Sequence, residues 1–285
     1  MAENIAIIDG DGLAFHSLRE TLGESLQALD ERMDNIITKT QATAYMLFIS
    51  KGKYFRHEIF PDYKKPRDKY KKDRVTYTRT LKAVLQDKYG AVFMPRVEAD
   101  DLCAYFYIKL WSVPDNPINA ILCTPDKDLL KGIPSFNKQG HFNYSFKVED
   151  KTVENSPIVR GWWIDTSIDE ASEVFWTSMI AGDSSDGVPG IFKKGPKAAK
   201  KLFDSIDSPI INDTIYSNVV LDYFIEHYGV SKGIFEFQKH YRVLRLLQND
   251  EEFKQEVGIT PDEAGVGVVR ELETNPFEDD SSNQW

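Results

Sequence analysis

Short apolar runs that alternate with segments of helical periodicity constrain this chain more than any other feature of its sequence. The runs expected to form strands cover 4–9, 44–50, 91–95, 118–124 and 161–164. The helical periodicities between them cover 26–37, 77–89, 99–111 and 168–180. Strands that alternate with helices in this way form a largely parallel sheet. We therefore predict an α/β fold with a central, mostly parallel sheet flanked by helices.

The remaining segments predict an inserted pair of strands, a helical subdomain and a tail. A polar segment at 136–154 is expected to form two short inserted strands, and beyond residue 182 we expect only helices, near 196–203, 214–227 and 234–247. Residues 250–285 carry eleven acidic and two basic side chains, a composition typical of a largely disordered acidic tail. The predicted domains are a core at 1–180, a helical subdomain at 181–249 and the tail at 250–285.

The composition indicates a globular protein that is neither exported nor inserted in a membrane. Of the 285 residues 41% are hydrophobic, enough for a sizeable core, and no apolar run approaches the roughly 18 residues of a membrane helix. Cys103 and Cys123 form no CxxC or Cys/His pattern, which argues against zinc and against a disulfide framework. We expect a cytoplasmic protein, in the host cytoplasm if the chain is viral.

The net charge of −10 conceals two basic patches. The segment 250–285 contributes −9, which leaves −1 for residues 1–249. Within that near-neutral body, 64–74 has seven basic and two acidic residues, and 193–201 has five lysines and no acid. Concentrated positive charge of this kind suits a nucleic-acid backbone, although each patch alone is equally typical of a solvated surface.

Acidic side chains follow three of the predicted strands and one predicted helix. Ligands of open α/β sheets bind beyond the carboxyl ends of the strands, so these side chains are expected to converge, although any one of them alone is more typical of a helix cap or turn. Eight carboxylates in one cleft require protons or bound cations, and oxygen ligands suit Mg²⁺ or Mn²⁺ better than zinc. The candidates are Asp9, Glu98, Asp100, Asp101, Asp126, Asp128, Asp183 and Asp186.

The spacing of these residues favours two cations. Glu98 and Asp101 lie three apart at the start of a predicted helix, while Asp126 and Asp128 share one face of an extended segment. Two cations about 4 Å apart stabilise the attacking and leaving oxygens of phosphoryl transfer. The chemistry that this arrangement predicts is phosphodiester hydrolysis.

Five motifs in a fixed order resemble the 5′-nucleases, the family of flap endonucleases, polymerase 5′-nuclease domains and bacteriophage 5′ to 3′ exonucleases. They are IIDGDGLAF at 7–15, YFRHE with PDYKKPR at 54–67, VEADD at 97–101, TPDKDLL at 124–130 and AGDSSDGVPGI at 181–191. The resemblance implies a PIN-like fold with a helical arch near 61–90 and a helix-three-turn-helix within 181–249. In length and in its strand-rich insertion the chain is most similar to the bacteriophage enzymes.

The resemblance also implies residue roles. Asp9, Glu98 and Asp100, with Asp101 close by, would hold the first metal, and Asp126, Asp128, Asp183 and Asp186 the second. Lys64 and Arg67 would contact the scissile phosphate as catalytic residues, and Tyr63 would stack on a base. The arch would bind DNA through Lys65, Lys69, Lys71, Lys72 and Arg74. The helix-three-turn-helix would bind DNA, and in the family often K⁺, through Gly190, Lys193, Lys194, Gly195 and Lys197.

Two positions depart from the family pattern. Ser50 stands where the family has an aspartate at the end of the second strand, and Lys193 stands where it usually has a glycine. Asp11 is one group that could replace the missing charge, although an ordinary turn residue is the preferred interpretation of Asp11.

The function implied by the resemblance is a structure-specific 5′ to 3′ exonuclease and 5′-flap endonuclease. It would act on DNA 5′ ends, flaps and RNA–DNA hybrids, as in primer removal during phage DNA replication. Two separate hypotheses concern the acidic tail, which would either compete with DNA for the basic patches or bind replication proteins through Phe277 and Trp285. Two alternatives remain open. One is a haloacid-dehalogenase-type phosphatase with Asp9 as nucleophile. The other is a noncatalytic DNA-structure-binding protein, which the serine at position 50 motivates.

Overall fold

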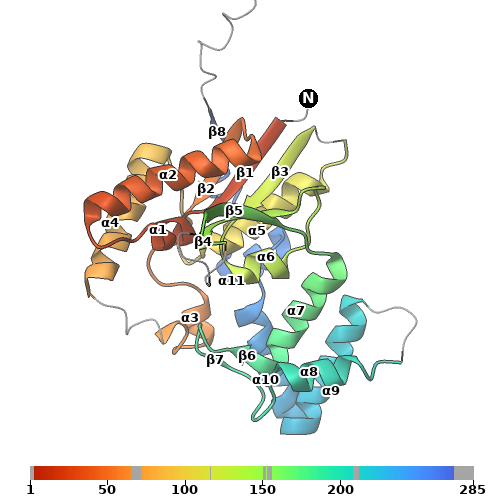
Figure 1. The fold of residues 1–285 in the computed structure, drawn as a ribbon. Helices are drawn as coiled ribbons and strands as arrows, with labels where there is room; N and C mark the ends of the chain where they lie inside the picture. The colour runs from red at the N-terminus through yellow and green to blue at the C-terminus, as the bar shows by residue number, and fades with distance from the viewer. Residues whose placement is uncertain are drawn as a thin grey trace, which may run out of the picture.

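A six-stranded sheet forms the centre of the molecule (Figure 1). The computed structural model describes residues 3–65, 72–115, 117–149, 152, 156–207 and 212–272. The strand order is β5-β4-β3-β1-β2-β8, in which β1 to β4 run parallel and the edge strands β5 and β8 run antiparallel. The strands are β1 (Glu3–Asp9), β2 (Ala44–Phe48), β3 (Ile118–Cys123), β4 (His141–Val148), β5 (Ile158–Ile164) and β8 (Arg270–Glu271). The predicted mostly parallel α/β core is confirmed.

The sheet register brings the carboxyl ends of the central strands to one edge. Asp9 pairs with Phe48 of β2, and Ile8 pairs with Cys123 of β3. The residues that follow β1, β2 and β3 therefore leave the sheet side by side. This is the edge where a parallel α/β sheet binds ligands.

Helices cover both faces of the sheet because the strands are apolar on both sides. On one face, Ile5 and Ile7 pack with α5 (Ala99–Ser112), α6 (Lys127–Gly132) and α11 (Asp250–Val257). On the other, Ala6 and Ile8 pack with α1 (Gly10–His16), α2 (Leu22–Thr40) and α4 (Lys72–Tyr89). The result is a three-layer core around β1.

Helix α2 shows how local signals set these elements. A capping box between Thr21 and Glu24 begins it, and Gln41 ends it in the left-handed conformation at φ 51°. Its buried side chains include Leu29, Met33 and Ile36, spaced at three and four residues. The predicted helix 26–37 is therefore confirmed but extends further at both ends.

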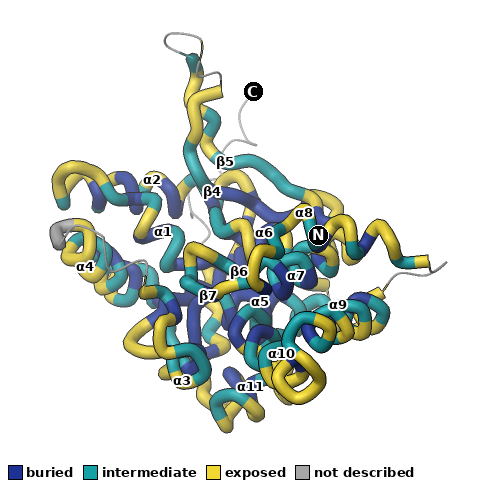
Figure 2. The backbone as a smooth tube through the Cα atoms, turned by 90° about the horizontal axis from the view of Figure 1, so that it is seen from below, coloured by how far each residue is buried: buried dark blue, intermediate teal, exposed yellow. Residues whose placement is uncertain are grey.

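A second cluster of helices lies beside the carboxyl edge of the sheet. Helices α7 (Ile168–Ala181), α8 (Pro196–Phe203), α9 (Asp213–Tyr228) and α10 (Val230–Leu244) share a core that includes Trp176 and Phe224. The short elements α3 (Arg56–Ile59), β6 (Gly182–Asp183) and β7 (Val188–Pro189) lie beside this cluster, below the sheet in the view of Figure 1. Figure 2 shows the buried positions gathered around α5 and the exposed positions on the outer turns of α2, α4 and α10.

Three strand predictions were wrong. The run 91–95 makes only a single bridge, between Val92 and Phe48. The segment 136–154 is no separate insertion, because its strand β4 joins the main sheet between β3 and β5. Beyond residue 182 the chain also forms β6, β7 and β8, which are too short to produce a visible alternation in sequence.

The expectation of a disordered tail fails for 250–272. Helix α11 begins after the Asn249 cap, and its Phe253 is fully buried in the core beneath the sheet. Strand β8 pairs with β2, with Arg270 opposite Tyr45. The high acidic content of the segment concealed the few apolar side chains that anchor it. Residues 273–285 lie outside the described residues.

The predicted helical arch is described in part. Helix α4 begins at Lys72 and packs Leu81 and Leu85 into the core, whereas 66–71 lie outside the described residues. The arch itself thus stays a prediction. Within the described ranges, no helix combines the length and apolar character that crossing a membrane requires.

We predict that replacing Phe253 lowers the stability of the whole core. The Phe253→Ala variant should lose about 3–5 kcal/mol in free energy of unfolding, because it removes a fully buried aromatic ring. Phe192→Ala is the matched control, since Phe192 is 75% exposed, and it should change stability by less than about 0.5 kcal/mol. Urea unfolding followed by circular dichroism measures both. Equal stability of the two variants would show that α11 is no part of the core.

Candidate metal centre and nucleic-acid interface

Two of the predicted ligands cap helices at the carboxyl edge of the sheet. Asp9 caps α1, and its two oxygens accept hydrogen bonds from the Gly12 N–H and the Thr124 hydroxyl, both at 3.0 Å. Asp126 caps α6 by accepting from the Asp128 N–H at 2.8 Å. Both helix N-termini therefore point toward this edge, where their dipoles favour negative charge. Asp9 and Asp126 therefore each cap a helix and are also candidate metal ligands.

The carboxylates of the first group repel one another. Burial raises the pKa of Asp9 to about 7, with help from the nearby Asp11 and Asp126 carboxylates. Burial also raises the pKa of Asp100 well above its ordinary value, followed by repulsion from Asp9 and Asp126. As predicted, Asp100 turns toward the strand ends. Protons or cations are needed to hold these groups together.

The second group surrounds Asp128. The Asp128 side chain is 51% exposed. Partial burial, followed by repulsion from Asp126, raises its pKa to about 7. Asp183 ends β6, and its pKa is lowered because hydrogen bonds from the Ser185 hydroxyl and N–H outweigh burial. Asp186 lies three residues further on and donates its N–H to Asp183 Oδ1 at 3.3 Å.

One small cavity connects the acidic side chains of three separate segments. It has a volume of about 90 Å³, and its lining includes Glu98 and Asp100 of the α5 start, Asp128 of α6, and Asp183 and Asp186 of the β6–β7 segment. The convergence predicted for these five residues is therefore present. Asp9 and Asp126 join them through their electrostatic interaction with Asp100.

The donor set fits hard divalent cations. All the converging groups are carboxylates, and the raised pKa values of Asp9, Asp100 and Asp128 indicate an excess of negative charge that a cation would relieve. In the described part of the chain, no three His, Cys, Asp or Glu side chains already stand close enough to enclose an ion. Cation binding would therefore draw the carboxylates inward by side-chain rotation.

Asp101 does not belong to this group, contrary to prediction. Both of its oxygens accept hydrogen bonds from Arg56, at 2.6 and 2.7 Å, and one of them also accepts from the Leu247 N–H at 3.0 Å. Both side chains are almost fully buried. Since its lone pairs are taken by this ion pair, Asp101 positions the segment and is not available to a metal.

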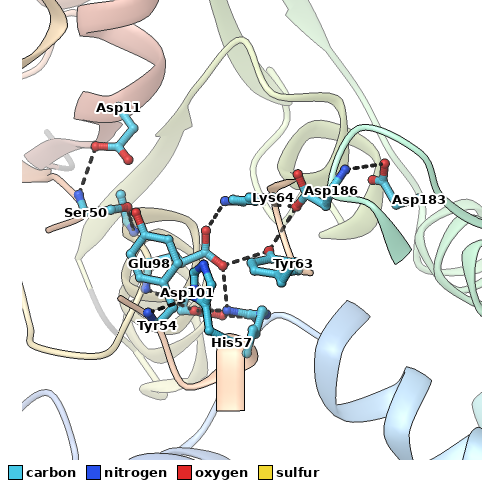
Figure 3. A network of polar contacts seen from close by, with 12 residues as sticks. Asp11, Ser50, Tyr54, His57, Tyr63, Lys64, Glu98, Asp101, Asp183 and Asp186 are labelled. Carbon is cyan, nitrogen blue, oxygen red and sulfur yellow. Dashed lines mark hydrogen bonds and ion pairs between the residues drawn. The ribbon is translucent and has the colours of Figure 1, made fainter. Parts of the chain in front are cut away.

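Glu98 is held by cations of the protein. Burial alone would raise its pKa, but Lys64 and Arg56 lower it to about 2. Lys64 Nζ donates to Glu98 Oε1, and the Tyr63 hydroxyl lies 2.8 Å from Oε2. The same hydroxyl lies 2.9 Å from Asp186 Oδ2, so it links α5 with the β6–β7 segment (Figure 3).

The Tyr63 ring is not placed for stacking on a base. It is 6% exposed and packs with Val188 and Val243, with the His57 ring edge-on at 5.5 Å. Stacking would require this turn to open. Lys64, by contrast, pairs with Glu98, which lines the cavity. Lys64 adopts the left-handed conformation at φ 59° and donates its N–H to the Asp186 carbonyl.

The predicted arch residues are described only at its ends. Lys65 is exposed and pairs with Asp62 at 3.0 Å, and the Arg74 guanidinium lies 5.4 Å above the Phe15 ring. Arg67, Lys69 and Lys71 lie outside the described residues, as does the side chain of Lys72.

The predicted helix-three-turn-helix segment connects α7 with α8. A Cβ at Gly190 would lie 2.3 Å from the Ala181 carbonyl carbon, so only glycine fits there, and Gly195 caps α8. Lys193 adopts φ 59°, a left-handed conformation that favours glycine. Lys193 and Lys197 are exposed and Lys194 is half-buried, with Nζ 5.6 Å from the Tyr223 ring centre.

Sequence reasoning missed several residues of the site. Arg56 and Thr124 were recognised only as parts of motifs, although the Thr124 hydroxyl connects Asp9 with the Asp126 N–H. Lys82 of α4 was also missed, and it pairs with Asp11 at 2.6 Å. Each partner lies far away in the chain, so no local spacing could reveal the contact.

Comparison with known proteins identifies the family. Residues 4–153 match the family model described as 5′-3′ exonuclease, N-terminal resolvase-like domain. The chain belongs to this family. The match covers both the strands that deliver Asp9 and Asp126 and the start of α5. The haloacid-dehalogenase alternative is thereby set aside.

Relatives of known name agree with this assignment. The 5′-3′ exonuclease of Buchnera aphidicola subsp. Acyrthosiphon pisum is 25% identical over 228 residues, which cover 75% of this chain and 74% of that protein. The flap endonuclease Xni of Shewanella sp. (strain W3-18-1) is 25% identical over 203 residues, covering 69% and 72%. DNA polymerase I of Lactococcus lactis subsp. cremoris is 23% identical over 236 residues, covering 75% of this chain. The chain spans about a quarter of that polymerase, 25% of its length.

Solved structures show the same fold. A bacteriophage T5 flap endonuclease, in a pseudo-enzyme-product complex with DNA and metal ions, superposes with a TM-score of 0.58 at 17% identity, covering 86% of this chain and 90% of that chain. The T5 protein co-crystallized with metal ions gives a TM-score of 0.55 at 17% identity, covering 93% and 99%. The PIN-like 5′-nuclease fold predicted for the core is thus confirmed.

We predict that Mg²⁺ stabilises the chain more near pH 8 than near pH 6. Asp9 and Asp128 have pKa values of about 7 in the folded chain, against an ordinary aspartate pKa of 3.8, so the folded state holds protons that the unfolded state releases. Stability of the metal-free chain should therefore fall as pH rises from about 4 to about 7, and a cation offsets this loss only where the carboxylates are ionised.

Thermal unfolding with Mg²⁺ and with chelator at both pH values measures this difference. Asp128→Asn should reduce the gain from Mg²⁺, whereas Asp34→Asn on the exposed face of α2 should leave it unchanged. An equal gain in melting temperature from Mg²⁺ at both pH values would contradict the interpretation that these carboxylates are protonated near pH 6 and bind the cation when ionised.

Proposed function

We propose that the chain is a divalent-metal-dependent 5′ to 3′ exonuclease and 5′-flap endonuclease that hydrolyses phosphodiester bonds. The single observation that carries this proposal is the cavity that Glu98, Asp100, Asp128, Asp183 and Asp186 line together in a chain of the 5′-3′ exonuclease family. Lys64 supplies a cation that pairs with Glu98 of the cavity lining. Carboxylates with a nearby cation form the group set that metal-assisted phosphoryl transfer requires.

Two groups of residues would hold two cations. Asp9, Asp100 and Asp126 form one, and Asp126 with Asp128, Asp183 and Asp186 forms the other, so that Asp126 lies between them. Mg²⁺ is the expected ion, and Mn²⁺ is expected to substitute for it. Bound cations of this kind activate a water and stabilise the departing 3′ oxygen. The K⁺ ion implied by resemblance at the segment before α8 stays a prediction.

Lys64 would exchange one anionic partner for another during the reaction. Its ammonium lies against Glu98 and 4.0 Å from Asp186 Oδ2, at 17% exposure. A phosphate that enters the cavity competes with these carboxylates for the ammonium, which would then neutralise charge that develops on the phosphate. Arg67 is proposed for the same role from the resemblance alone.

The substrate would be held through its backbone. Lys193 and Lys194 present positive charge ahead of α8, Lys197 does so in its first turn, and Arg74 lies beside α1. Contacts of this kind read phosphates and not bases, so we propose that DNA 5′ ends, flaps and RNA–DNA hybrids are all accepted, with binding that weakens at high salt. The helix-three-turn-helix and the single-strand arch are parts of this proposal.

The cellular setting is also proposed. Removal of primers or of 5′ ends during DNA replication would use this activity, and replication proteins are proposed to bind the acidic residues after 272. The buried free thiols of Cys103 and Cys123 suit a reducing cytoplasm. An origin in a bacteriophage, with action in the host cytoplasm, stays a prediction.

The experiment is cleavage of a 5′-labelled flap duplex, a blunt duplex and an RNA–DNA hybrid, each with Mg²⁺, with Mn²⁺ and with chelator. We expect metal-dependent products from all three substrates. Asp128→Asn should lower the rate by at least about 100-fold, because it weakens the hold on the cation that would stabilise the transition state. DNA binding by that variant, measured by fluorescence anisotropy with Ca²⁺, should change little.

Asp34→Asn, on the exposed face of α2, is the matched control and should cut as the wild type does. An intact chain that binds the flap duplex with either metal but releases no product would overturn the proposal. It would instead favour the noncatalytic DNA-structure-binding alternative.

A further inference from the structure

Ser50 follows β2 and makes three hydrogen bonds there without bringing a charge of its own. Its N–H donates to Asp11 Oδ1 at 2.9 Å, its hydroxyl accepts from the Ala99 N–H at 2.8 Å, and its carbonyl accepts from Lys82 Nζ at 3.1 Å. Ser50 is 5% exposed, so these contacts lie inside the protein. Its hydroxyl caps the start of α5, directly before Asp100. No negative charge enters the cleft from Ser50 itself.

Asp11 brings a carboxylate to this place from a different strand. It lies in the first turn of α1, directly beyond β1, and Figure 3 shows its side chain reaching the backbone of Ser50. Apart from burial, Asp11 is the largest cause of the raised pKa of Asp9. Asp9 and Asp11 therefore face the same region, between the ends of β1 and β2.

The glycines on either side of Asp11 fix its position. A Cβ at Gly10 would lie 2.6 Å from the Phe48 carbonyl oxygen, and a Cβ at Gly12 would lie 2.5 Å from Asp9 Oδ2 and 2.8 Å from Pro125 Cδ. The first turn of α1 is thus packed tightly between the ends of β2 and β3. Because the backbone on either side is so confined, Asp11 projects from a rigid support.

The contacts of Asp11 use only one of its oxygens. Oδ1 accepts from the Ser50 N–H and pairs with Lys82 Nζ at 2.6 Å, and among the described residues Oδ2 accepts no hydrogen bond. The side chain is 30% exposed, and that of Lys82 is 20% exposed. An oriented carboxylate with one oxygen available beside Asp9 is suited to a cation, because a carboxylate can accept at about four lone-pair positions.

We propose that Asp11 is a cation ligand of the first carboxylate group, and that it supplies from α1 the negative charge that Ser50 does not supply from the end of β2. The inference deepens the proposed function, on which it rests. Lys82 then acts as the counter-ion of Asp11 when the cation is absent. The ion pair keeps the Asp11 carboxylate oriented and offsets part of its repulsion of Asp9.

The test is calorimetric titration of the full chain with Mn²⁺ and with Ca²⁺, without DNA. Asp11→Asn should weaken cation binding by about tenfold or more, because it removes a ligand oxygen charge while keeping the side-chain shape. In the double variant Asp11→Asn with Ser50→Asp, a carboxylate returns to the same place from β2. Its cation affinity should recover to within about threefold of the wild type.

Two further variants control for a purely structural role. Lys82→Met should tighten cation binding, because it removes the ammonium that competes for Asp11, and Asp34→Asn should match the wild type. Melting temperatures in chelator confirm that each variant is folded. Unchanged cation affinity in Asp11→Asn would overturn the proposal, as would a loss that Ser50→Asp does not restore, since the defect would then lie in the turn of α1.

Failure of this inference is distinguishable from failure of the proposed function. Cation titration needs no substrate, whereas the nuclease proposal depends on release of labelled products. A wild-type chain that binds cations and cuts no DNA would overturn the nuclease proposal while the comparison of variants still decides the role of Asp11.

Discussion

Repulsion between carboxylates at one edge of the sheet is the constraint on which the rest of this structure depends. Asp9, Asp100 and Asp128 all have raised pKa values, because burial and their acidic neighbours disfavour the charged forms. A fold gains no stability from such a cluster in the absence of cations. Such destabilising clusters are typical of functional sites. This one lies beyond the ends of the parallel strands, where an α/β protein binds ligands.

Buried cations of the protein confine this negative charge to the cleft. Arg56 holds Asp101 and Glu98 and also donates to the Val243 and Arg245 carbonyls at the end of α10. Arg56 therefore joins α3 and α5 to α10, and through α10 to the cluster of helices α7 to α10. Removing one partner from a buried pair of this kind costs about 3–5 kcal/mol, so Arg56 contributes both to the fold and to the width of the cleft. Lys64 pairs with Glu98 and Lys82 pairs with Asp11, so these two lysines also neutralise part of the negative charge.

Local sequence signals were enough for the core and for most of the ligand candidates. Apolar runs marked β1 and β3, helical spacing marked α5 and α8, and the carboxyl-edge rule grouped Asp9 with Asp100 and Asp128. The errors concern residues whose partners are distant in sequence. Asp101 resembles a ligand by its spacing from Glu98, but its partner Arg56 lies 45 residues away, and the Tyr63 hydroxyl meets Asp186 across 123 residues. Composition misled at 250–272, where many surface acids surround the one fully buried ring of Phe253.

The measurement that tests the central claim most directly is anomalous diffraction from crystals of the full chain grown with Mn²⁺. The account predicts two anomalous peaks about 4 Å apart in the cavity beyond β1 and β3. Carboxylate oxygens of Asp9, Asp100 and Asp126 should surround one of them, and those of Asp126, Asp128, Asp183 and Asp186 the other. Asp101 should remain on Arg56. Peaks that lie elsewhere, or a single ion bound by Asp101 after its separation from Arg56, would contradict the account.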